Sequence, residues 1–357
     1  MSLVGSPKQH AGDNSSQLSA GRDIVYNQGI TAQQMGEIMG QIATQVAAQI
    51  SPYTNAALQA VETRLDVFQR RLFQRFDDER AADKRAFADP DFQMVVGGAA
   101  KSFARSGDQK LGTALIEMIA NRSLLEKRSR ELLALNMAIE RVPLLTDNEL
   151  AALGTSFTFR YSISPRVNSL ESFADYLGPI VHEFLPDLVV DAGPYNHIAA
   201  CGCGDLETGE IQFRDLIMGK YGGLFSKGFQ RDDLAAYTQE GERHLLDAVP
   251  LCVCLNDPMK LQFPVVNRRV CVQQLTKCGF TEAASNNMTN FFESTFMPHG
   301  EFIEKMRIIL PGSEALVGLW NSSPLRSLRL NATGLAIGHA SYARHTGDET
   351  PLSIWIK

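Results

Sequence analysis

Residues 56–76 read AALQAVETRLDVFQRRLFQRF, and this stretch predicts the fold of the first half of the chain. Its large apolar side chains recur at alternating spacings of three and four residues, which places them along one seam of a helix. Glutamine, arginine and acidic residues occupy the positions between them, as expected for the face that meets solvent. The seam residues are Leu58, Val61, Leu65, Phe68 and Leu72.

The seam is short for a supercoil. It covers about three heptads, and Arg75 takes the next apolar position while Phe76 follows one residue later, a drift that fits a straight helix. We therefore favour a helical bundle within one chain over a free coiled coil. The five seam residues are also our candidate oligomer interface, together with Ile24 and Tyr26 nearer the N-terminus.

Composition indicates a globular cytoplasmic protein. The 357 residues are 44% hydrophobic and 21% charged, which is ordinary for two or three folded domains. The net charge of −6 argues against a large basic surface for nucleic acid. Residues 1–19 lack the apolar core of a signal peptide, so we expect the six cysteines to be reduced. No window reaches the roughly 18 apolar residues of a membrane span.

The chain divides into four regions by composition. Residues 1–30 are a polar leader rich in Gly, Asn and Gln; 31–88 form long amphipathic helices that serve oligomerisation; 89–165 form a helical bundle; and 166–357 form a smaller α+β part. The predicted fold class is mainly α. The C-terminal part carries a leucine-rich segment, a Thr-Gly helix start and an alternating strand at residues 352–356, and it resembles a winged-helix module.

Two resemblances point to one biological setting. Residues 20–30 read AGRDIVYNQGI, and the segment 17–30 resembles a leader that opens many bacterial proteins, several of them encoded near phage-defence genes. Residues 89–160 are similar in order and spacing to uncharacterised bacterial helical proteins grouped with abortive infection. That resemblance rests on Asp89-Pro90-Asp91, on the turn before Asp108, and on the capping box that Thr146 and Glu149 form. It implies a helical scaffold and a role in phage defence.

The cysteines suggest a metal site at first sight. Cys201-Gly-Cys203 and Cys252-Val-Cys254 are two C-x-C pairs, and His197 precedes the first by four residues. Four thiolates could hold a tetrahedral zinc, but zinc sites generally use C-x₂₋₄-C. Because free cysteine is often simply buried, we predict no metal and no cofactor.

Enzymatic signatures are weak in this sequence. Pro90-Asp91 followed by Asp108-Gln109-Lys110 fits a loose nuclease pattern, yet both pieces lie where helices are predicted rather than on adjoining strands. The sequence has no G-x-S-x-G elbow, P-loop or dinucleotide fingerprint. We therefore expect a protein that is not an enzyme.

The glycine-punctuated segment 221–229 has two interpretations. Leu224, Phe225 and Phe229 can pack into the core at a helix end, or they can form a loop that docks a partner. We carry them as candidate partner-docking residues.

The function that we expect is self-association and binding of a phage component or companion defence protein. One alternative is a metal-dependent nuclease or hydrolase. The other is a DNA-binding regulator whose C-terminal winged helix meets phosphates through Arg326, Arg329 and Arg344, although nucleic acid is not our expected partner.

Overall fold

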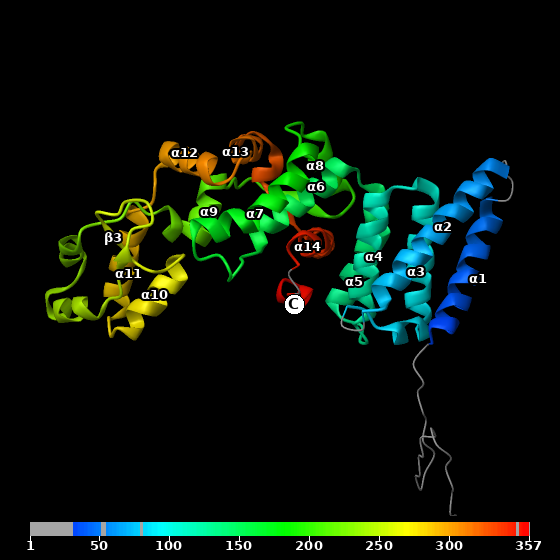
Figure 1. Cartoon of the computed structure of the whole chain (residues 1–357), viewed down its shortest axis with the longest axis horizontal. Coiled ribbons are helices and arrows are strands. Elements are labelled where there is room, and N and C mark those ends of the chain that lie inside the picture. The colour runs from blue at the N-terminus through cyan, green and yellow to red at the C-terminus, as the bar shows by residue number, and fades with distance from the viewer. Residues whose placement is uncertain (1–30, 51–54, 79–80, 348–349, 357) are drawn as a thin grey trace, which may run out of the picture.

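Five helices stand side by side at one end of the molecule (Figure 1). The computed structural model describes residues 31–50, 55–78, 81–347 and 350–356. Helix α2 contains the apolar seam and packs against α1, α3 and α4. The bounds are α1 (Ala32–Ile50), α2 (Asn55–Phe76), α3 (Pro90–Ser106), α4 (Gln109–Ser123) and α5 (Arg130–Arg141), with a 3-10 turn η1 (Lys84–Ala88) before α3.

Local caps explain where these helices begin. Asp89 accepts a hydrogen bond from the Asp91 amide, and Pro90 fits the first turn of α3 because its φ is already helical. Asp108 accepts from the Lys110 and Leu111 amides at the start of α4. Helix α5 begins at Arg130, after Ser129, whose side chain accepts a hydrogen bond from the Leu132 amide.

A central layer follows the five-helix bundle (Figure 1). Helix α14 lies at its middle and packs on α4, α5, α6 and α7, so the end of the chain closes against its first half. The layer contains η2 (Val142–Leu144), α6 (Asp147–Ser156), the π-helical turn η3 (Phe157–Tyr161), α7 (Leu170–Phe184), η4 (Leu185–Asp187), α8 (Gly193–Ala200), α9 (Phe213–Tyr221), η5 (Gly222–Phe225), α12 (His299–Ile309), α13 (Ser313–Ser322), η8 (Pro324–Arg326), α14 (Ala332–Thr346) and η9 (Leu352–Ile354).

A small lobe forms the other end of the molecule (Figure 1). It has its own hydrophobic core, built from residues between Phe229 and Phe292, whereas one larger core runs through the bundle and the central layer. The elements of the lobe are η6 (Arg231–Tyr237), η7 (Glu240–Ala248), β2 (Cys252–Val253), β3 (Leu261–Gln262), α10 (Arg268–Lys277) and α11 (Glu282–Ser294).

The described strands form two small antiparallel pairs. β1 (Gly204–Leu206) pairs with β4 (Leu328–Leu330), and β2 pairs with β3. The prediction of a strand at residues 352–356 is wrong. Leu352–Ile354 is a 3-10 turn, and Trp355 donates its indole N–H to the Tyr161 carbonyl. In the small lobe, η6 and η7 are both 3-10 helices rather than α-helices.

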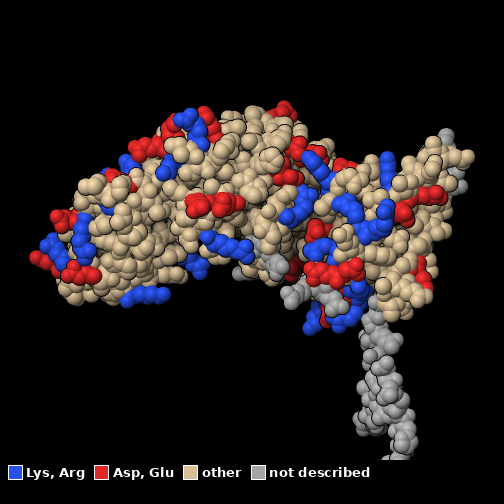
Figure 2. Space-filling view, in the orientation of Figure 1, with Lys and Arg blue, Asp and Glu red and all other residues tan. Residues whose placement is uncertain are grey.

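The fold is mainly α with small strands in its C-terminal part, which confirms the predicted class. Among the residues that the structure describes, no helix combines the length and apolar character that crossing a bilayer requires. On the face that Figure 2 shows, basic and acidic side chains are interspersed and form no extended basic surface.

Candidate functional site

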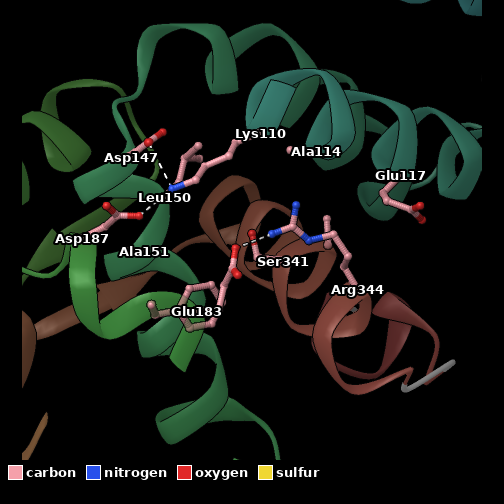
Figure 3. Close-up of a pocket in the computed structure, with 12 residues that line it drawn as sticks. Lys110, Ala114, Glu117, Asp147, Leu150, Ala151, Glu183, Asp187, Ser341 and Arg344 are labelled. Carbon is pink, nitrogen blue, oxygen red and sulfur yellow. Dashed lines mark hydrogen bonds and ion pairs between the residues drawn. The ribbon is translucent and has the colours of Figure 1, made fainter. Parts of the chain in front are cut away.

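A small pocket lies where the bundle meets the central layer (Figure 3). Helix α4 forms one wall, and α6, α7, η4 and α14 form the others. Its cavity volume is ≈ 40 Å³, which holds a few water molecules and no larger ligand.

Most of the charged groups of this pocket pair with one another. The Lys110 ammonium lies 3.2 Å from the Asp147 carboxylate and 2.8 Å from that of Asp187, so one cation joins α4 to α6 and to η4. Arg344 of α14 lies 2.9 Å from Glu183 of α7. The two carboxylates raise the pKa of Lys110, the Asp187 hydrogen bond most strongly. The ion pairs of Lys110 thus connect the five-helix bundle to the central layer.

A larger groove runs between α1 and α3. Its cavity volume is ≈ 400 Å³, within the range of ligand-binding clefts. The α3 side presents Pro90, Met94, Gly97, Gly98 and Lys101, which recur at helical spacing and so lie on one face. The α1 side presents Ile38, Gln41, Ile42, Gln45 and Val46.

The groove is open because its floor lacks side chains. A Cβ atom added at Gly98 would meet no other atom within 4 Å, and one at Gly97 would meet only Ile42, at 3.9 Å. Met94 stands at the rim with 79% of its surface exposed. Lys101 is the only charged residue among those lining the groove. An apolar floor with glutamine rims suits another helix better than a charged small molecule.

Most of the described residues that were predicted to form interfaces are buried in the fold. The seam packs within the bundle, as the preferred interpretation requires, and Leu224, Phe225 and Phe229 are buried. Ile24 and Tyr26 lie outside the described residues, so their role stays a prediction. In the seam, Leu58 is half-buried, and Val61, Leu65, Phe68 and Leu72 are 6%, 5%, 0% and 0% exposed.

The nuclease pattern is not assembled as a metal site. Asp91 binds the Arg122 guanidinium at 2.9 Å, and Asp108 caps α4 through backbone amides. Lys110 pairs with the pocket carboxylates. Each of these side chains thus has a structural partner, and the two aspartates lie at the starts of different helices.

The arginines expected to meet phosphates are engaged in ion pairs. Arg326 lies 2.9 Å from Glu210, Arg329 lies 2.7 Å from Glu207, and Arg344 pairs with Glu183. Glu207 raises the pKa of Arg329 through its hydrogen bond. These contacts neutralise the charge that a DNA-binding surface would need.

The two C-x-C pairs lie in different parts of the fold. Cys201 and Cys203 connect α8 to β1, whereas Cys252 and Cys254 belong to the small lobe. Within the described residues, no three His, Cys, Asp or Glu side chains are grouped to hold a metal ion. The four-thiolate site is therefore absent from this part of the chain.

One series of polar side-chain contacts was not predicted from the sequence. Glu149 of α6 lies 2.6 Å from His197 Nδ1, and His197 Nε2 lies 3.5 Å from Cys201 Sγ. The spacing of His197 and Cys201 by four residues is visible in the sequence and signals a shared helical face. Glu149 is 48 residues away from His197, so its role as partner could not be predicted.

Residues 29–356 match one protein-family model. The match covers most of the chain, and the chain belongs to this family. No curated protein and no solved structure matches it.

Proposed function

We propose that this chain is a non-enzymatic, self-associating cytoplasmic protein of bacterial anti-phage defence, which also binds a phage component or a companion protein. The α1–α3 groove is the observation that carries the proposal. In this groove, Gly97 and Gly98 of α3 form a floor without side chains, and the cavity volume is ≈ 400 Å³.

The occupant that fits this groove is a second copy of the chain. Helix α1 forms one wall, so a two-fold axis along the groove would lay α1 of each copy into the groove of the other. Helix α1 carries no basic residue, and its exposed positions are mostly glutamine, alanine, threonine and glycine. Such a helix matches a groove lined by glutamines and apolar side chains and containing one lysine.

The phage-defence setting rests on the two sequence resemblances. The leader at residues 17–30 immediately precedes α1 in the sequence, and α1 forms one wall of the groove. The bundle similarity at residues 89–160 includes α3, the other wall of the groove.

Filling the groove tests the proposal. Gly98→Trp adds an indole at the floor of the groove, at a position where a Cβ meets no atom within 4 Å. The matched control is Gly318→Trp in α13, an equally open glycine outside the groove. Light scattering on the full chain should show an assembly for the wild type and the Gly318 variant, and a smaller species for Gly98→Trp.

Two further results would overturn or extend the proposal. A wild-type chain that is monomeric at every concentration, or an assembly unchanged by Gly98→Trp, would remove the groove as the interface. A plaque assay in a bacterial host that expresses each variant tests the defence role, and protection should follow assembly. Removing residues 1–30 shows whether Ile24 and Tyr26 contribute.

A further inference from the structure

A polar pocket lies on the small lobe, at the end of the molecule away from the five-helix bundle (Figure 1). Its cavity volume is ≈ 400 Å³, within the range of small-ligand sites. Helix α11 forms one wall, and the end of η6 with the turn that follows it forms the other. The pocket shares no residue with the α1–α3 groove and is independent of the self-association proposed above. Its lining residues are Ala236, Tyr237, Thr238, Gln239, Asn287 and Asn290.

Tyr237 presents an aromatic face in this pocket. One side of its ring stacks on Phe291, with 4.4 Å between the ring centroids and 24° between the ring planes. Phe291 belongs to the hydrophobic core of the lobe and is 7% exposed, whereas Tyr237 is 41% exposed. Because Phe291 covers one face of the Tyr237 ring, the opposite face is left for a ligand.

The core of the lobe holds both walls of the pocket. Thr238 is 7% exposed, and its hydroxyl donates to the Leu234 carbonyl at 2.8 Å, which ties the turn after η6 to a buried residue. Asn287 and Asn290 are three residues apart and lie on one face of α11. Met288 of the same helix is buried in the core of the lobe. The aromatic face and the two asparagines therefore have fixed relative positions.

Three carboxamide groups surround the aromatic face. Asn290 Oδ1 accepts a hydrogen bond from Arg268 at 3.1 Å, which leaves the Asn290 NH₂ group as a donor. Among the described residues, the carboxamides of Gln239 and Asn287 have no hydrogen-bond partner. A carboxamide carries both a donor and an acceptor. The pocket therefore suits a ligand whose polar groups also donate and accept.

The charges around the pocket disfavour an anionic ligand. None of the six lining side chains is charged. Residues 231–248, which contribute four of them, include five acidic and two basic side chains, a net charge of −3 with histidine neutral. Arg231 pairs with Asp247, and Arg268 pairs with Glu293. A phosphate or carboxylate would meet a negative potential here, so a neutral ligand fits the pocket better than a nucleotide.

A sugar ring has the matching chemistry. One face of a pyranose is a layer of C–H groups, and its rim carries hydroxyls that each donate and accept hydrogen bonds. The C–H groups bear a small positive charge, so the negative face of an aromatic ring attracts them. We propose that the pocket binds a neutral saccharide of one or two rings, with its C–H face on Tyr237 and its hydroxyls bonded to the three carboxamides.

Isothermal titration of the full-length chain with small saccharides tests the site. The probes are maltose, cellobiose and lactose, with sialyllactose as an acidic saccharide and adenosine as a neutral nucleoside that also stacks on aromatic rings. At least one neutral disaccharide should bind, with one molecule per chain, and sialyllactose should bind more weakly than the tightest of them. Binding of adenosine alone, tighter binding of sialyllactose, or binding of no neutral disaccharide would overturn the proposal.

Substitutions separate the aromatic face from the fold of the lobe. Tyr237→Leu keeps an apolar group over Phe291 but removes the flat ring, and it should weaken binding about tenfold or more. Tyr237→Phe keeps the ring and should retain binding. Asn287→Ala removes one hydrogen-bonding group and should weaken binding by about 2–10-fold. Gln273→Ala, at an exposed position of α10 in the same lobe, is the control and should bind like the wild type.

Nuclear magnetic resonance of the unmodified chain tests the site without any substitution. In protein with isotope-labelled asparagine, the saccharide should shift the side-chain amide signals of Asn287 and Asn290. It should leave the signal of Asn196, an exposed residue of α8, unchanged. Unshifted Asn287 and Asn290 signals at saturating saccharide, or wild-type affinity in Tyr237→Leu, would place the sugar outside this pocket and contradict the proposal.

Discussion

Arg122 Nη2 lies 2.9 Å from the Asp91 carboxylate, and it joins α4 to the first turn of α3. The two partners differ sharply in environment, because the Arg122 side chain is 2% exposed and that of Asp91 is 57% exposed. Arg122 also donates to Asn136 and to the Leu125 carbonyl, and its guanidinium lies 5.8 Å from the centre of the Phe92 ring. The buried cation therefore organises this corner of the bundle.

We predict an asymmetric response to truncation of this pair. Arg122→Ala removes the packing and several hydrogen bonds of a buried long side chain and should lower the free energy of unfolding by about 2–4 kcal/mol. Asp91→Ala leaves Asp89, at 3.4 Å, as the remaining counter-charge of the buried guanidinium, and it should cost less than Arg122→Ala, about 1–3 kcal/mol. Urea unfolding at neutral pH measures both. Equal losses would show that the exposed carboxylate, rather than the buried guanidinium, holds the corner.

The role of Asp108 can be separated from a catalytic one by conservative substitution. Its carboxylate accepts from the Lys110 and Leu111 amides at 2.8 and 3.1 Å. Asp108→Ala should lower the free energy of unfolding by about 1 kcal/mol, whereas Asp108→Ser, which also caps helices, should retain most of it. If plaque protection were lost in the serine variant while stability was kept, the carboxylate would have a chemical role and the cap would not explain it.

The helix N-caps could be predicted because each one is a hydrogen bond between residues only a few positions apart in the sequence. The starts of α3, α4 and α6 follow from Asp89, Asp108 and Thr146, and each of these caps is observed. The apolar seam of α2 follows from spacing alone, and its burial in the bundle agrees with the preferred intramolecular packing. Short-range hydrogen bonds and helical periodicity are properties of the local sequence.

Contacts between distant segments could not be predicted. Asp91 and Arg122 are 31 residues apart, and no spacing rule links them. The groove between α1 and α3 depends on how two helices cross, and its floor depends on glycines that the sequence shows only as weak helix formers. The alternation at residues 352–356 suggested a strand, but the Trp355 indole binds the Tyr161 carbonyl and Ile356 enters the core, so the segment turns instead.

The amine of Lys220 should make stability depend on pH. It donates to the carbonyls of Ser162 and Thr158 at the end of the π-helical turn, and burial lowers its pKa to about 7. In the unfolded chain the amine keeps its ordinary pKa of 10.5. Between about pH 7 and pH 10 the unfolded state therefore binds a proton that the folded state lacks, and the free energy of unfolding rises with pH.

Replacing this lysine should remove that dependence. Relative to Lys220→Met, the wild type should gain stability with pH, by at most about 1.4 kcal/mol per pH unit inside the window. Urea unfolding at pH 7, 8 and 9 gives the two slopes. Lys277→Met, at an exposed position of α10 outside the groove, is the control, and its stability should change with pH as that of the wild type does. Parallel curves for Lys220→Met as well would mean that the amine stays charged in the folded protein.

The close approach of α14 to the turn after α8 makes Gly334 sensitive to any side chain. A Cβ at this position would lie 1.8 Å from the Cys203 carbonyl oxygen, a backbone atom that cannot rotate away. Gly334→Ala should therefore force the helix and the turn apart and lower the free energy of unfolding by about 1–3 kcal/mol, although alanine is the better helix former. Gly318→Ala, where a Cβ meets no atom within 4 Å, should instead stabilise the chain by up to about 1 kcal/mol. Thermal and urea unfolding of the two variants should thus shift in opposite directions. A stabilising effect at both glycines would mean that α14 does not approach the Cys203 carbonyl this closely.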